Sequence, residues 1–89
     1  MNQHVSANDL VPAASARKIQ EMLSRNLRIL AHRKGITQAD LARSVGLHRT
    51  QIRRYMDGTS HPPPVYLYRI CLFFKVDARI LHQPLEELE

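Results

Sequence analysis

Residues 35–58 decide the fold: GITQADLARSVGLHRTQIRRYMDG. All three glycines of the chain lie in this stretch, at positions 35, 46 and 58. Glycine commonly ends a helix because it adopts the left-handed backbone conformation without steric cost. Two short segments with helical spacing of apolar residues lie between the glycines. The stretch therefore predicts helices over 38–45 and 48–57, joined by a tight turn at Gly46-Leu47.

The first of these helices has a clear start signal. Thr37 can accept a hydrogen bond from the backbone N–H of Asp40, and the Asp40 side chain can reach back to the N–H of Thr37. The inward face is predicted to carry Leu41, Ala42 and Val45.

The second helix separates apolar from basic side chains. At about 100° per residue, Ile52, Tyr55 and Met56 share one side. Thr50, Arg53, Arg54 and Asp57 fall on the opposite side, and Arg49 lies at the N-terminal end. Residues 48–56 contain no acid, whereas an ordinary solvated face more often mixes Glu with Arg. Two short helices joined in this way can place the second in the major groove of DNA.

Other residues are predicted to contact phosphates. Gln38 stands at the start of the first motif helix, where free N–H groups and the helix dipole favour an anion. Contacts of this kind position a protein without reading sequence. We assign the same role, with a plain surface role as the alternative for each, to Thr37, Arg43, Gln51, Arg53 and His61.

The flanking sequence predicts three more helical elements. Apolar residues at 19, 23, 27 and 30 indicate a helix over 16–34, and those at 67, 70, 71 and 74 indicate one over 65–75. A short fifth element holds Ile80 and Leu81, and a last turn after Pro84 holds Leu85 and Leu88. We predict a flexible tail at 1–15, one all-α domain at 16–82 and a short acidic C-terminal segment at 83–89.

Charge and cysteine content narrow the function. The net charge is +5, and residues 17–54 carry ten Lys or Arg against only Glu21 and Asp40. This distribution is typical of a polyanion binder, and a solvated basic surface is the alternative that charge alone leaves open. The lone cysteine, Cys71, excludes an intrachain disulfide and paired-cysteine metal sites. The five histidines lack metal-ligand spacing, and no catalytic grouping is evident. We expect a cytoplasmic protein that is not an enzyme. We also expect that it uses no cofactor or metal, binds no small-molecule substrate and does not span a membrane.

The run 35–42, GITQADLA, followed by Val45-Gly46-Leu47, Ile52, Gly58 and a proline-bearing loop, resembles the Cro/C1-type helix-turn-helix family of phage and bacterial repressors. The resemblance covers about residues 23–81. It implies a compact five-helix, lambda-repressor-like fold and sequence-specific operator binding, commonly as a dimer, in a bacterial or phage-encoded protein associated with the nucleoid. By position, it places base contacts on Arg49, Thr50 and Arg54, and phosphate contacts on Gln38, Thr37 and Gln51.

Two departures from the family pattern matter. Family members often carry an Arg–Glu bridge where this chain has Ala31 and Met56. Because replacing both partners by apolar groups can be neutral or stabilising, we expect an intact fold with Met56 buried. The second departure is His48, where Ser or Thr usually caps the helix, so we expect this helix start to fray or to be fixed by DNA.

A protein-interaction module on the same fold, such as an antitoxin, is the rival prediction. Its support is a set of aromatic and aliphatic residues largely off the predicted core stripe of helix 65–75, which would form an exposed apolar patch. The same patch would suit homodimerisation, unless the last elements cover it. It comprises Tyr66, Tyr68, Leu72 and Phe73.

Overall fold

The computed structural model describes residues 13–81 and 83–88, and these residues form helices and no strand. The all-α prediction is thus confirmed. The elements are α1 (Ala13–Lys34), α2 (Gln38–Val45), α3 (Arg49–Asp57), α4 (Pro64–Phe74), the 3-10 turn η1 (Ala78–Leu81) and the single-turn helix α5 (Leu85–Leu88). The count of five helices is not confirmed, because the fifth predicted helix is the 3-10 turn η1.

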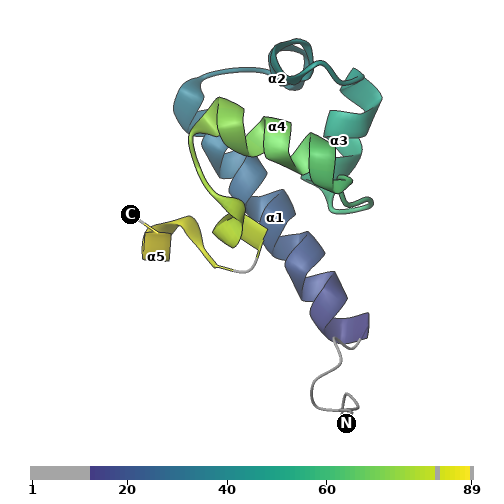
Figure 1. Cartoon of the computed structure of the whole chain (residues 1–89), viewed down its shortest axis with the longest axis vertical. Helices are drawn as coiled ribbons and strands as arrows, with labels where there is room; N and C mark the ends of the chain where they lie inside the picture. The colour runs from purple at the N-terminus through teal and green to yellow at the C-terminus, as the bar shows by residue number, and fades with distance from the viewer. Residues whose placement is uncertain (1–12, 82, 89) are drawn as a thin grey trace, which may run out of the picture.

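The long helix α1 is the axis on which the other elements pack (Figure 1). It contacts α3 and η1, while α2 contacts both α3 and α4. Figure 1 shows α2, α3 and α4 gathered around the C-terminal part of α1, with its N-terminal turns extending beyond them. The predicted domain 16–82 therefore has its core at one end of α1.

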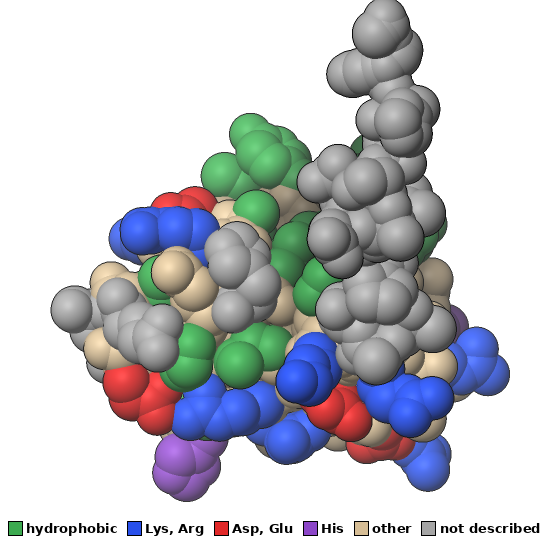
Figure 2. Space-filling view, turned by 90° about the horizontal axis from the view of Figure 1, so that it is seen from below, with side chains coloured by type: hydrophobic (Ala, Val, Ile, Leu, Met, Phe, Trp, Pro, Cys, Tyr) green, Lys and Arg blue, Asp and Glu red, His purple; other side chains and the backbone are tan. Residues whose placement is uncertain are grey.

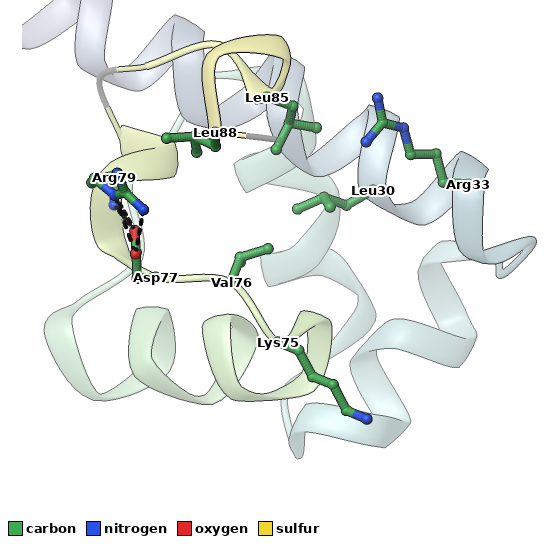
Figure 3. Close-up of a pocket in the computed structure, with 8 residues that line it drawn as sticks. All are labelled: Leu30, Arg33, Lys75, Val76, Asp77, Arg79, Leu85 and Leu88. Carbon is green, nitrogen blue, oxygen red and sulfur yellow. Dashed lines mark hydrogen bonds and ion pairs between the residues drawn. The ribbon is translucent and has the colours of Figure 1, made fainter.

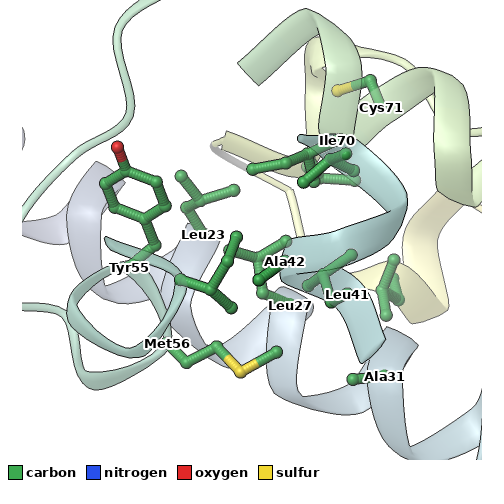
Figure 4. Packing of buried hydrophobic residues seen from close by; sticks show 13 residues of the cluster. Leu23, Leu27, Ala31, Leu41, Ala42, Tyr55, Met56, Ile70 and Cys71 are labelled. Atoms are coloured by element: carbon green, nitrogen blue, oxygen red, sulfur yellow. The ribbon is translucent and has the colours of Figure 1, made fainter. Parts of the chain in front are cut away.

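The core joins every helix of the bundle (Figure 4). Leu23 and Leu27 of α1 meet Leu41 of α2, Ile52 of α3 and Ile70 of α4, and each of these side chains is at most 1% exposed. Burying a side chain of this size contributes about 1.5–3 kcal/mol. The predicted inward faces of α2 and α3 are confirmed, since all six residues assigned to them are buried: Leu41, Ala42, Val45, Ile52, Tyr55 and Met56.

Helix α4 is less deeply seated than predicted. Ile70 and Cys71 are buried, but Leu67 and Phe74 are only half-buried against the core. Burial raises the pKa of the Cys71 thiol, as expected for a cysteine used as a small apolar residue.

The apolar replacement at 31 and 56 is observed. Ala31 is 6% exposed and Met56 is 4% exposed, and both belong to the same buried cluster. Figure 4 shows the Met56 side chain pointing toward α1 rather than toward solvent. The expectation of an intact helix contact without the family's bridge is therefore confirmed.

Two helix starts differ from the prediction. Helix α1 begins at Ala13, three residues early, because the alanines at 13 and 14 favour helix although they lie outside the apolar stripe. The rest of the predicted tail, 1–12, lies outside the described residues. Helix α4 begins at Pro64, since proline at a first helical position loses no hydrogen bond.

A buried asparagine ties the C-terminal segment to α1. Asn26 is fully buried, and its Nδ2 donates to the carbonyl oxygens of Ile80 at 2.7 Å and Gln83 at 3.0 Å. Leu85 is 3% exposed, and Glu86 forms an ion pair with Arg25 at 2.6 Å. The described part of the predicted acidic segment 83–89 is therefore packed on the domain.

Side chains of α1 also hold the C-terminal end of α3. Ser24 Oγ and Arg28 Nη1 both donate to the carbonyl oxygen of Met56 at 2.5 Å. Gln20 Nε2 donates to the carbonyl oxygen of Gly58 at 2.7 Å. The last carbonyls of a helix lack partners within it, and a cation near them is favoured by the helix dipole. We call Gln20, Ser24 and Arg28 the carbonyl clamp.

The carbonyl clamp predicts non-additive mutations. Ser24→Ala and Arg28→Met should each lower the free energy of unfolding by about 1 kcal/mol, because one donor still satisfies the Met56 carbonyl. The double variant should lose more than the sum of the two, by about 0.5 kcal/mol or more, since the carbonyl is then unpaired. Urea denaturation measures all three. A loss in the double variant equal to the sum of the two single losses would contradict a shared carbonyl. The control is Arg17→Met, on the exposed side of α1.

Candidate nucleic-acid interface

The start of α2 is fixed by a reciprocal cap, as predicted. Thr37 Oγ1 accepts from the Asp40 N–H at 3.0 Å, and Asp40 Oδ2 accepts from the Thr37 N–H at 2.9 Å. Hydrogen bonding of the Asp40 carboxylate to Thr37, and the nearby Arg43, lower the pKa of this carboxyl from its ordinary value. The first turn of α2 is therefore rigid, and Gln38 is held at its N-terminal end.

The turn between α2 and α3 depends on Gly46. This residue has φ of 72°, in the left-handed region, and its N–H donates to the Ala42 carbonyl. An added Cβ would meet Arg69 Nη1 only at 3.6 Å, an ordinary contact distance, so backbone strain rather than crowding requires glycine. Leu47 is half-buried against the core, so the turn is anchored there just before α3.

The expectation that the start of α3 frays is wrong. His48 Nδ1 accepts from the Thr50 N–H at 3.1 Å, and Gln51 Oε1 accepts from the His48 N–H at 3.0 Å. An unprotonated imidazole nitrogen accepts a hydrogen bond as a Ser or Thr oxygen does. We call His48 and Gln51 the imidazole cap. The Gln51 side chain, predicted to contact a phosphate, is thus engaged in the cap.

The outward face of α3 matches the prediction. Arg49, Thr50, Arg53 and Arg54 are all exposed, while Ile52 is 1% exposed on the opposite side. Arg53 Nε lies 3.7 Å from Asp57 Oδ2, with both side chains more than half exposed. The basic side chains therefore point away from the protein core.

Two shallow hollows show which predicted residues share a surface. The first is formed by the start of α2 and the outward side of α3, and it brings together Thr37, Gln38, Ala39, Arg49, Thr50 and Arg53. The second lies on the other side of Arg49 and includes Arg43 and His48. Arg54 and His61 line neither of these hollows, although both are exposed. Arg43 is occupied by an ion pair with Asp40 Oδ1 at 2.5 Å.

Positive charge is not confined to α3. Seen from below Figure 1, the surface carries a row of Lys and Arg side chains along one side, with Asp and Glu among them (Figure 2). This differs from residues 48–56, where no acid interrupts the arginines.

A separate pocket lies between α1, η1 and α5 (Figure 3). Arg79 closes one side through an ion pair with Asp77 at 3.1 Å, and Leu30, Leu85 and Leu88 supply apolar walls. It shares no residue with the two hollows beside α3. In the described part of the chain, no group of three or more His, Cys, Asp or Glu could hold a metal ion.

The predicted apolar patch on α4 is corrected by the structure. Tyr68 and Leu72 are 64% and 58% exposed, and Val65, which the sequence prediction omitted, is 61% exposed. Tyr66 and Phe73 are half-buried and lie near cations, with Arg69 over the Tyr66 ring and Lys34 Nζ over the Phe73 ring. Val65, Tyr68 and Leu72 form the α4 stripe. Their i, i+3, i+7 spacing was the available signal.

The sequence model of the helix-turn-helix domain family matches residues 22–82. The chain therefore belongs to the helix-turn-helix domain family, and this membership indicates DNA as its partner. No curated protein and no solved structure matches the chain. Among the described residues, no helix combines the length and hydropathy that a membrane span requires.

The cap of α2 predicts a pH dependence. Because folding lowers the pKa of Asp40, its ionised form contributes stability above the unfolded pKa, near 3.8, and this contribution is lost as the pH falls through the lower folded pKa. Asp40→Asn should therefore be less stable than the wild type at pH 6, and the difference should shrink below about pH 4. Urea midpoints from pH 6 to pH 3 measure it. A difference that is the same at every pH would refute this role of Asp40.

Proposed function

We propose that this protein binds double-stranded DNA in a sequence-specific manner and regulates transcription as a repressor of the Cro/C1 type. One observation carries the proposal: the exposed Arg49, Thr50 and Arg53 of α3 share a continuous surface with the capped start of α2. A recognition helix in the major groove needs this arrangement, because the preceding helix must reach the phosphates while the second reads the bases. The lambda-repressor-like fold belongs to the same proposal.

Roles follow from position on this surface. Arg49 and Thr50 on this surface, and Arg54 exposed on α3 outside the hollow, contact bases, since arginine can pair with guanine and threonine can touch the thymine methyl. Gln38 and Thr37 bind phosphate with the free N–H groups of α2. Arg53, Arg43 and His61 supply further phosphate contacts from the exposed surface. Gln51 contributes through the imidazole cap instead.

The proposal includes a cytoplasmic, bacterial or phage-encoded protein without enzymatic activity. The buried position of Cys71, with its raised pKa, supports a structural thiol rather than a nucleophile.

Base and phosphate contacts predict different mutant behaviour. Arg54→Ala should cost about 1–3 kcal/mol on the preferred site and relax the preference at one base pair, whereas Gln38→Ala should weaken binding to all sequences alike. The test is binding to duplexes selected from a random pool, compared with unselected duplexes, at several salt concentrations. For each tenfold rise in salt concentration, the logarithm of the binding constant should fall by about 0.9 for every phosphate that the protein neutralises. No dependence on salt would reject DNA binding, and identical losses in both variants would reject these roles.

The α4 stripe supports a second activity, association with another copy of the chain. Its three exposed side chains are uncharged, and an apolar hollow beside it is lined by Pro64, Leu67, Tyr68, Cys71, Leu72, Val76, Asp77 and Ala78. A two-fold contact sets a patch against its own copy, so a patch without charge avoids repulsion in a chain of net charge +5. A different protein partner, as in an antitoxin, is the alternative.

Leu72→Lys should abolish self-association. The substitution places like charges opposite each other in a two-fold contact, while the folded monomer should keep its stability within about 0.5 kcal/mol because Leu72 is 58% exposed. Sedimentation equilibrium of wild type and variant measures the effect. A wild type that stays monomeric at every concentration would rule out the homodimer and favour a different protein on this stripe.

A further inference from the structure

The two ends of α3 are secured by chemically different groups. The C-terminal end is held by the neutral and permanently charged donors of the carbonyl clamp, Gln20, Ser24 and Arg28. The N-terminal end, which presents Arg49 and Thr50, is held by the imidazole cap. Only the second depends on an imidazole, whose Nδ1 accepts a hydrogen bond when it carries no proton and donates one when it does.

Protonation of His48 at Nδ1 is incompatible with the imidazole cap. The Thr50 N–H donates to His48 Nδ1 at 3.1 Å, so this nitrogen must carry a free lone pair. A proton there would place two donors face to face. The imidazole would have to turn away, leaving the first N–H groups of α3 without their side-chain partner.

Apart from His48 itself, the hollow that His48 lines is formed by apolar and cationic residues. Its lining comprises Ala39, Ala42 and Arg43 of α2, Leu47 of the turn and Arg49 of α3. The positive end of the α3 dipole adds to the two arginines. Arg43 is paired with Asp40, and Arg49 lines the same hollow as His48.

We propose that His48, supported by Gln51, is a positioning residue for the base-reading end of α3, and that its cap makes sequence discrimination dependent on pH. This inference rests on the proposed DNA binding. With the cap formed, Arg49 and Thr50 start α3 from a fixed backbone. With His48 protonated, the first turn loosens, and the new positive charge beside Arg43 and Arg49 strengthens attraction to any phosphate. Sequence discrimination therefore falls as the pH drops, because the base-reading contacts weaken while attraction to any duplex grows.

The experiment compares affinity for a duplex selected from a random pool with affinity for a scrambled duplex, from pH 8 to pH 5.5. For the wild type, the ratio should fall by about fivefold or more, the size typical of a lost cap. His48→Ser, an N-cap that does not titrate, should keep the high ratio at every pH. His48→Ala should show a low ratio at every pH. His32→Gln, which removes an exposed imidazole of α1, is the matched control and should follow the wild type.

A second measurement uses the free protein. In NMR spectra, the amide signals of Arg49 and Thr50 should shift with the same midpoint as the His48 ring, and should not shift in that range in His48→Ser. A discrimination ratio that is flat for the wild type, or equally pH-dependent in His48→Ser, would overturn the inference while leaving DNA binding intact. Failure of the wild type to bind any duplex at any pH would overturn both proposals. Amide signals that do not follow His48 would overturn the cap itself.

Discussion

The fold depends on how the unsatisfied ends of α3 find partners outside that helix. A nine-residue helix, Arg49–Asp57, leaves almost as many terminal N–H and C=O groups unpaired as it pairs internally. Side chains of α1 donate to the Met56 carbonyl in its last turn, and the imidazole cap binds its start. A helix this short is marginal alone in water. Its orientation is therefore set by these partners together with burial of Ile52 and Met56.

The carbonyl clamp also supplies a charged contact between α1 and α3, whose side-chain contact at positions 31 and 56 is apolar. At positions 31 and 56 the contact between α1 and α3 is apolar. One turn earlier on α1, Arg28 binds the backbone carbonyl of Met56 instead. A backbone carbonyl is present whatever the side chain at 56 is, so this link tolerates the apolar replacement. The charged contact is kept, while the cost of desolvating a carboxylate in the core is avoided.

The elements of the fold could be predicted from the sequence because their signals are local. Glycines ended the helices at 35, 46 and 58, and the Thr37–Asp40 pair started α2. The misses have non-local or geometric causes. Nothing in the spacing of Ser24 and Arg28 shows that they face the end of α3, 28 or more residues away. The rule that histidine caps poorly failed because Gln51 completes the cap. The α4 stripe could not be predicted from hydrophobicity alone, because its members are identified by the helical spacing of Val65, Tyr68 and Leu72.

The acids near the proposed interface hold their arginines only weakly. The Arg53–Asp57 and Arg43–Asp40 pairs lie on the surface, with arginine side chains 71% and 73% exposed. Exposed pairs of this kind are worth about 0–1 kcal/mol, so either arginine can exchange its carboxylate for a phosphate at small cost. Asp40 would still retain its hydrogen bond from Thr37 after such an exchange. The cap of α2 is therefore independent of whether Arg43 binds Asp40 or DNA, and the helix start that would meet the duplex stays rigid in both states.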